Sequence, residues 1–130
     1  MELQQKKLWT AGIHGVKTPH GKAVQSNSKD ALQIRKYVDN GGELYRTGTF
    51  GKSNTTNAQF WSPKNPISTS NYASKYGLAN SKVDYIIGGQ KVQGTSYVTR
   101  TAPGVNTNLG GGIEVVTYPN SVKLKFFHMP

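Results

Sequence analysis

The sequence contains no cysteine and few acidic residues. Without cysteine, disulfide bonds, thiolate nucleophiles and cysteine-ligated zinc are excluded. Asp and Glu number 6 against 16 Lys and Arg, so the net charge is +10. In a folded domain a surplus of this size is usually offset by a polyanion, and nucleic acid is the commonest one. The charge therefore predicts a nucleic-acid partner; a basic protein that is only soluble, or that binds an acidic protein, is the alternative.

Long hydrophobic runs are also lacking, and no apolar stretch approaches the length of a membrane span. The polar residues 1–7 are not followed by a hydrophobic segment, so no signal peptide is expected here and any export signal is expected on a larger precursor. The three His and six carboxylates show no metal-binding spacing such as HExxH. We therefore expect no metal and no cofactor.

The chain does have 15 Gly, seven Tyr, four Phe and two Trp, which indicates a sheet-and-loop protein with an aromatic core. Its 130 residues fit one domain, residues 1–130. The predicted fold class is α+β, with an N-terminal helix or helices packed on a mostly antiparallel twisted sheet. Residues 1–27, which glycine and proline interrupt, are expected to form an irregular N-terminal arm.

Local patterns predict the individual elements. A helix is expected over 29–39, because Ser28 is a suitable N-cap and Asn40-Gly41-Gly42 ends the helix. A second, short helix is expected over 69–76, ended by Gly77. The turn Pro119-Asn120 predicts that the last two strands pair as a hairpin, and a glycine-rich loop covers 102–112. Strands are predicted over 43–49, 83–87 (ended by Gly88-Gly89), 96–101, 113–118 and 122–127.

Metal-independent RNA cleavage uses the 2′-hydroxyl as nucleophile and needs a general base, a general acid and cations around the phosphate. An imidazole titrates near neutral pH, so His128 and His14 are the candidates for base or acid. Arg46 and Arg100 are the candidates for stabilising the charge on phosphorus, with the hydroxyl of Thr99 as a nearby donor.

Glu114 is an acid within an apolar strand, an arrangement that is costly unless the carboxylate is paired or functional. We count it among the catalytic candidates. The alternative is that Arg46 and Glu114 form a structural ion pair with each other. Exposed cationic and aromatic side chains contact phosphates and unpaired bases. The predicted RNA-binding residues are Lys17, His20, Lys22, Trp61, Lys123 and Lys125. Unengaged loop histidines and a core position for the tryptophan are the competing interpretations.

Several segments together resemble the C-terminal toxin domains of bacterial polymorphic toxins, and most closely the tRNase class of contact-dependent growth inhibition (CDI) toxins. The resemblance covers about residues 28–128, and its motifs include Arg46, Thr99, Arg100 and Glu114, whereas the positions of His14, His20 and His128 vary. The segments that carry it are residues 42–48, 58–62, 72–77, 98–104 and 110–116.

The resemblance implies a ribonuclease that cleaves tRNA near its acceptor end and so inhibits growth of a target bacterium. It implies a domain at the tip of a large secreted cell-surface protein, delivered into the cytoplasm of the target cell. It also implies a cognate immunity protein as partner, with elongation factor Tu as a candidate helper. A monomer is expected.

Two other functions stay open. The order of strand Arg46, then Ser68-Thr69-Ser70, then strand Glu114 is similar to the Arg, Ser-Thr-Ser, Glu order of the ADP-ribosyltransferase superfamily. That similarity implies an NAD-consuming transferase or NAD glycohydrolase, in which Arg and Ser hold NAD and Glu stabilises the ribosyl cation. The third hypothesis is a nucleic-acid-binding module without catalysis, whose binding would depend strongly on salt.

Overall fold

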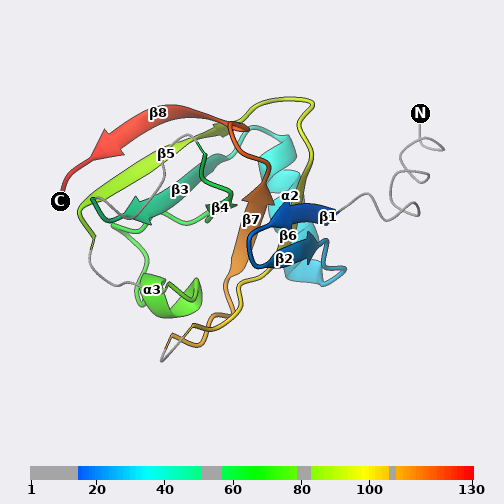
Figure 1. Ribbon diagram of the computed structural model, residues 1–130, viewed down its shortest axis with the longest axis horizontal. Helices are drawn as coiled ribbons and strands as arrows, with labels where there is room; N and C mark the ends of the chain where they lie inside the picture. The colour runs from blue at the N-terminus through cyan, green and yellow to red at the C-terminus, as the bar shows by residue number, and fades with distance from the viewer. Residues whose placement is uncertain (1–14, 51–56, 79–82, 106–107) are drawn as a thin grey trace.

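The fold is an α+β arrangement of mostly antiparallel sheets with a helix packed on one of them, which confirms the predicted class (Figure 1). The computed structural model describes residues 15–50, 57–78, 83–105 and 108–130. The elements are β1 (Gly15–Thr18), β2 (Gly21–Val24), α2 (Lys29–Asp39), β3 (Glu43–Gly48), β4 (Phe60–Trp61), α3 (Tyr72–Lys75), β5 (Tyr85–Lys91), β6 (Tyr97–Thr101), β7 (Ile113–Thr117) and β8 (Val122–His128).

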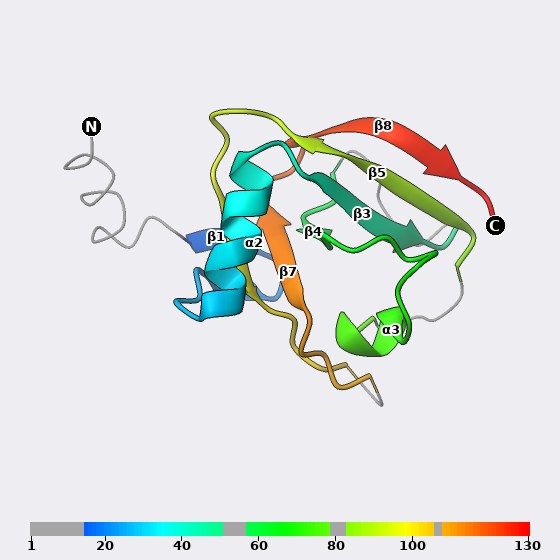
Figure 2. The same cartoon turned by 180° about the vertical axis from the view of Figure 1, so that it is seen from behind.

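Helix α2 begins and ends where the sequence predicts. The Ser28 hydroxyl accepts a hydrogen bond from the Ala31 amide at 3.1 Å, and Gly41 has φ +82° just beyond the C-cap. Ala31 and Val38 are buried on the face that covers the sheet. Seen from behind, α2 lies across β6 and β7 (Figure 2).

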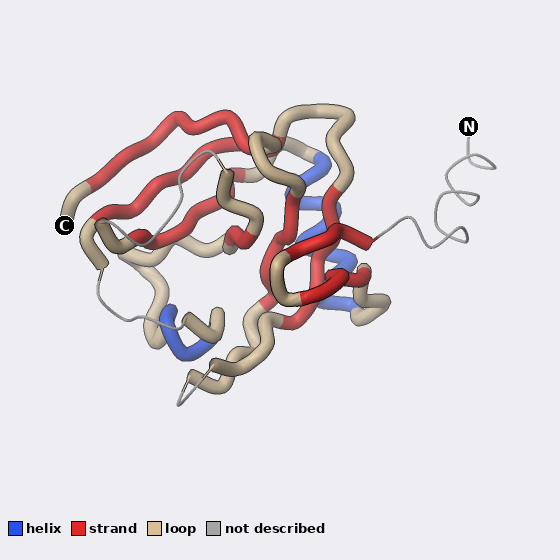
Figure 3. The backbone as a smooth tube through the Cα atoms, viewed as in Figure 1, coloured by secondary structure: helices blue, strands red, loops and turns tan. Residues whose placement is uncertain are grey.

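Apart from β1 and β2, which pair with each other, the strands form two three-stranded antiparallel sheets, β3-β5-β8 and β4-β7-β6 (Figure 3). They meet where Tyr45 and Ser62 exchange backbone hydrogen bonds of 2.7 and 2.8 Å. The strand order across both sheets is therefore β6-β7-β4-β3-β5-β8. The main core, which joins the sheets and α2, includes Val38, Leu44, Trp61, Ile87 and Val115.

The predicted irregular arm is wrong for residues 15–24, which form the antiparallel hairpin β1–β2. Its turn contains Gly21 at φ +108°, a conformation that favours glycine. Val16 and Ala23 are fully buried against Val98 and Val116 of the sheet β4-β7-β6. Two apolar residues that lie opposite each other in the hairpin are thus enough to dock this polar segment. Residues 1–14 lie outside the described part of the chain.

The predicted pairing of the last two strands is also wrong. The turn at Asn120, with φ +62°, passes the chain from β7, which pairs with β4 and β6, to β8, which pairs with β5. Strand β5 continues through Gly88 and Gly89, where a strand end was predicted. Glycine is needed there because β8 lies close by: a Cβ on Gly89 would lie 2.0 Å from the Lys123 carbonyl oxygen. Helix α3 is shorter than predicted, and Gly77 at φ +56° follows it.

Candidate active site

The register of the sheet β4-β7-β6 brings three polar residues into one row. Arg100 of β6 lies opposite Glu114 of β7, and Trp61 of β4 lies opposite Val115. Continuing this antiparallel register by one position places Ser62 opposite Glu114. Because side chains alternate along a strand, Ser62, Glu114 and Arg100 share one face, and α2 covers the other. The sheet therefore sets a hydroxyl, a carboxylate and a guanidinium side by side.

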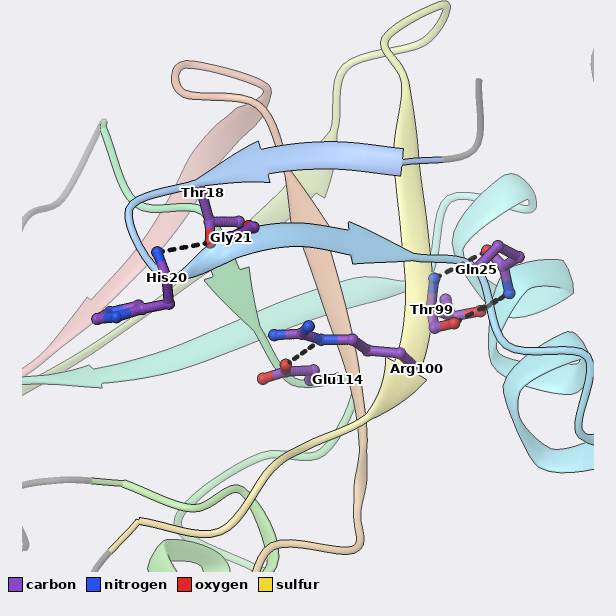
Figure 4. A network of polar contacts seen from close by, with 7 residues as sticks. All are labelled: Thr18, His20, Gly21, Gln25, Thr99, Arg100 and Glu114. Atoms are coloured by element: carbon purple, nitrogen blue, oxygen red, sulfur yellow. Dashed lines mark hydrogen bonds and ion pairs between the residues drawn. The ribbon is translucent and has the colours of Figure 1, made fainter. Parts of the chain in front are cut away.

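Glu114 is only 6% exposed, and its Oε2 accepts a hydrogen bond from Nε of Arg100 at 2.8 Å (Figure 4). Burial raises the pKa of Glu114, and the Arg100 cation opposes that rise. The predicted structural pair between Arg46 and Glu114 is therefore wrong, because the β6–β7 register supplies Arg100 as the partner. A buried carboxylate balanced by one cation is typical of a functional site.

Two tyrosines of the α3 region lie over this row. The Tyr72 hydroxyl and Oγ of Ser62 share a hydrogen bond at 2.5 Å, and the Tyr72 and Tyr76 rings pack with centroids 4.8 Å apart. Burial raises the pKa of both phenols, to about 12 for Tyr76, and the charge of Glu114 contributes to both shifts. Both hydroxyls are therefore protonated at neutral pH, and their rings form an aromatic wall beside the carboxylate.

Arg46 of β3 lies next to this row but on the other face of the sheet, because Tyr45 is the residue opposite Ser62 and the Arg46 guanidinium lies 6.0 Å from the Trp61 ring. Its Nη1 donates to the Phe60 carbonyl at 3.0 Å, whereas its buried Nε meets no hydrogen-bond acceptor among the described residues. Burial lowers the pKa of the guanidinium, yet an arginine remains charged at neutral pH. The charges of both Arg46 and Glu114 act on the pKa of Tyr72: that of Arg46 lowers it and that of Glu114 raises it. We name the set the Glu114 cluster, and its members are Arg46, Ser62, Tyr72, Tyr76, Arg100 and Glu114.

Thr99, a predicted catalytic donor, and Trp61, a predicted RNA contact, both make their hydrogen bonds inside the fold. The fully buried Thr99 hydroxyl donates to the Ala31 carbonyl at 2.7 Å and accepts from Nε2 of Gln25 at 2.7 Å. Trp61 is 3% exposed, and its Nε1 donates to the Ala58 carbonyl at 3.2 Å. Neither predicted role holds, because neither side chain reaches a surface that RNA can touch.

The structure describes two of the three histidines, and they lie in different parts of the fold. His14 lies outside the described residues. His128 ends β8 and stacks on Phe126, whose ring packs edge-on against Tyr45. Strand alternation and register put these three side chains on the face of the sheet β3-β5-β8 opposite Arg46. The predicted cooperation of His128 with Arg46 therefore does not hold.

His20 is the described imidazole that lies beside the cluster. It sits at the β1–β2 turn, where the Thr18 hydroxyl accepts from its backbone amide at 3.1 Å. Its ring centroid is 6.2 Å from that of Phe60, and the Arg100 guanidinium carbon lies 5.9 Å from the same ring. Figure 4 shows the hairpin running across the strands that carry Arg100 and Glu114.

The predicted RNA-binding lysines divide between two regions. Lys17 and Lys22 are exposed on the outer face of the hairpin β1–β2, whose inner face packs on the sheet that carries Glu114. Lys123 and Lys125 are exposed on β8, at the edge of the other sheet, and Lys125 donates to Oε1 of Gln90 at 2.6 Å. The four lysines therefore do not form one continuous strip around the site.

The sequence pointed to Ser68 and Ser70 and did not single out Ser62. Ser68 and Ser70 are exposed in the turn before α3, whereas Ser62 is buried next to Glu114. The available signal was the position of Ser62, two residues after Phe60, which gives it the same orientation on a short strand. Tyr72 and Tyr76 are both buried and belong to the Glu114 cluster.

A cavity of about 380 Å³ lies near the cluster but on the other side of the sheet, since Ile34 of α2 and Ile113 of β7 line it. Tyr76 is the member of the cluster that it touches. In the described segments, no three His, Cys, Asp or Glu residues lie close enough to hold a metal ion. No helix in this part of the chain is long and apolar enough to span a membrane.

Comparisons of the chain with models of protein families, with curated proteins and with solved structures find no match. The function is therefore argued from the site itself.

Proposed function

We propose that this protein consumes NAD, as an ADP-ribosyltransferase or an NAD glycohydrolase, by breaking the bond between C1′ of the ribose and nicotinamide. The observation that carries the proposal is the row of Ser62, Glu114 and Arg100 on one sheet face, with Arg46 on the adjoining strand. In this proposal Arg46 and Glu114 take the roles of the Arg and Glu in the Arg, Ser-Thr-Ser, Glu order. Ser62 takes the role that the sequence suggested for Ser68-Thr69-Ser70.

The chemistry suits a site with a carboxylate and no acid catalyst. Cleavage of the glycosidic bond leaves an oxocarbenium-like ribose, which a carboxylate held in a low-dielectric site stabilises. The departing nitrogen is already cationic in NAD, so nicotinamide leaves as a neutral molecule without a proton donor. Glu114 alone can therefore supply the main electrostatic stabilisation, and the position of His128 on β8, three strands away from β4 in the strand order, is no obstacle.

Binding of the dinucleotide follows from the remaining groups. The side chain of Arg46, which is partly exposed although its Nε is buried, offers a charged donor to the pyrophosphate, an anion for which arginine is well suited. The rings of Tyr72 and Tyr76 offer an apolar surface to the nicotinamide plane. Arg100 holds the Glu114 carboxylate in place through its 2.8 Å hydrogen bond, which makes it a positioning residue.

The test is the release of nicotinamide from NAD by the purified protein, measured by chromatography. Glu114→Gln keeps the shape of the side chain and removes its charge, and we expect a loss of rate of about 100-fold or more. Glu43→Gln, at an exposed position of β3, is the matched control and should keep the rate. Intact NAD with the wild-type protein, or equal rates for Glu114→Gln and wild type, would reject the proposal.

A second candidate is the metal-independent endoribonuclease that the resemblance implies, with tRNA as substrate. The observation that favours it is that His20 and Arg100, the partner of Glu114, both lie against the Phe60 ring, in a protein of charge +10. In this reaction His20 and Glu114 act as the general base and general acid: one accepts the proton of the 2′-hydroxyl and the other donates a proton to the leaving oxygen. Arg100 stabilises the charge on phosphorus. RNA fragments with 2′,3′-cyclic phosphate ends, formed in EDTA and lost with His20→Ala while NAD stays intact, would favour it over NAD cleavage.

Both candidates fit a growth-inhibiting toxin, which we propose as the biological role. Delivery by a larger cell-surface protein, a cognate immunity protein and a contribution from elongation factor Tu belong to that proposal. Expression in a bacterial host should stop growth, and Glu114→Gln should restore it. A fall in cellular NAD before any loss of tRNA distinguishes the first candidate from the second.

A further inference from the structure

We propose that the hairpin β1–β2 holds a polynucleotide beside the Glu114 cluster, so that the acceptor of ADP-ribose is a nucleic acid. The inference rests on the proposed NAD cleavage. The motivation is a disproportion of charge: NAD carries a single pyrophosphate, whereas the chain has a net charge of +10. A surplus of this size is typical of proteins that bind the phosphate backbone of nucleic acids.

The hairpin has a fixed position on the sheet. Its inner residues Val16 and Ala23 are fully buried, and Nε2 of Gln59 donates to the Lys17 carbonyl at 2.8 Å. The Thr18 hydroxyl donates to the Gly21 carbonyl at 2.7 Å and so closes the turn. The charged side chains of the hairpin therefore extend from a backbone that these contacts hold against the sheet.

Lys17 and Lys22 lie directly opposite each other in the hairpin register. Two like charges at a cross-strand position repel, and residues 15–24 contain no Asp or Glu. Gly15 makes room for the stem of Lys22, because a Cβ there would lie 2.0 Å from Cε of Lys22. A phosphate between the two ammonium groups would relieve the repulsion, and successive phosphates of a strand are the natural ligand.

The tip of the hairpin leads from these lysines to the reacting centre. The ring centroid of His20 at the turn lies 6.2 Å from that of Phe60, and the guanidinium of Arg100, the partner of Glu114, lies 5.9 Å from the same ring. Figure 4 shows His20 and the Arg100–Glu114 pair within the same region of the molecule. A strand held on the hairpin thus passes close to the carboxylate where the ribosyl cation forms.

The transfer step balances without a further reagent. The C1′–N bond breaks, and its electron pair leaves with nicotinamide. A lone pair on an oxygen or nitrogen of the nucleotide then forms the new bond to C1′, and the proton of that group passes to solvent. The products are nicotinamide, an ADP-ribosylated polynucleotide and one proton.

The experiment uses the full chain with NAD and either an RNA oligonucleotide or the DNA of the same sequence, and measures the mass of the oligonucleotide. We expect one added ADP-ribose, and the two arms distinguish RNA from DNA as the source of the acceptor. The double variant Lys17→Gln/Lys22→Gln should lose about tenfold in modification. Its release of nicotinamide without nucleic acid should stay near the wild-type rate. The matched control is Lys123→Gln/Lys125→Gln on β8, which should modify the oligonucleotide normally.

Equal modification by the two double variants would overturn the role of the hairpin. Label on protein only, ADP-ribose in solution only, or cleaved RNA would overturn a nucleic-acid acceptor. Absence of nicotinamide release would instead overturn the proposed NAD cleavage. In that case the role of the hairpin is tested by oligonucleotide binding, measured by fluorescence anisotropy. Equal affinities of the two double variants would reject that role.

Discussion

Two faces of the molecule carry aromatic and ionisable side chains, and they differ in burial. The Glu114 cluster holds a carboxylate that is 6% exposed, hydrogen-bonded to Arg100 and adjacent to two buried tyrosines. The outer face of the sheet β3-β5-β8 holds Phe126, which is 37% exposed, stacked on the exposed His128. The first face contains charges that the fold has desolvated, whereas the second leaves its ionisable group in water.

The comparison teaches that residue type alone does not identify a site. Histidine is the residue expected for acid–base work at neutral pH, and His128 was a natural candidate. The structure places it on the side of the sheet opposite Arg46. Desolvation strengthens electrostatic interactions, so the buried carboxylate is the better candidate for stabilising a cation.

Among the substitutions that test this difference, the largest effect is expected for Arg46→Lys. The substitution keeps the positive charge but removes the planar guanidinium and its buried Nε. We expect kcat/KM for NAD cleavage to fall about tenfold or more, mainly through KM. Steady-state nicotinamide release measures the effect, and the melting temperature verifies folding. An unchanged KM would remove Arg46 from the binding site.

The pH dependence of NAD cleavage tests the electrostatics of the buried face. Only ionised Glu114 stabilises the ribosyl cation, and burial raises its pKa above the ordinary 4.5. Activity should therefore fall, as the pH is lowered, at a pH above 4.5. Arg100→Gln removes the opposing cation and should move this loss to still higher pH. An acid limb at or below the ordinary value would contradict the proposed environment of Glu114.

Thr99→Val tests whether Thr99 is structural rather than catalytic. The variant loses the hydrogen bonds to the Ala31 carbonyl and the Gln25 amide, so the free energy of unfolding should fall by about 1–3 kcal/mol. The rate of NAD cleavage by the folded protein should change little. Denaturant unfolding measures the first quantity. Thr101→Val, at an exposed position of the same strand, is the control and should keep wild-type stability.

The smallest effect is expected for His128→Ala, which addresses the exposed face. The side chain lies away from Arg46, so we expect the rate of NAD cleavage to stay within about twofold, as for surface substitutions away from a site. A large loss of activity would break the comparison between the two faces. It would return His128 to the catalytic candidates and favour RNA cleavage.

Part of the fold and of the site could be predicted locally. Helix α2 carries its signals in neighbouring residues, the Ser28 cap and the glycines after Asn40. Arg46 and Glu114 attracted attention because a charge within an apolar strand needs a partner or a function. The hairpin β1–β2 escaped prediction because its stability comes from contacts with Val98 and Val116, far along the chain.

The sequence by itself determined the surplus of positive charge, the absence of cysteine chemistry, the helix and the α+β class, because these depend on composition and short-range patterns. Only the tertiary structure decided that Arg100 pairs with Glu114, that Ser62 joins them and that His128 does not. Strand register between distant segments is set by packing of the whole core, and a shift of one residue would turn each side chain to the opposite face.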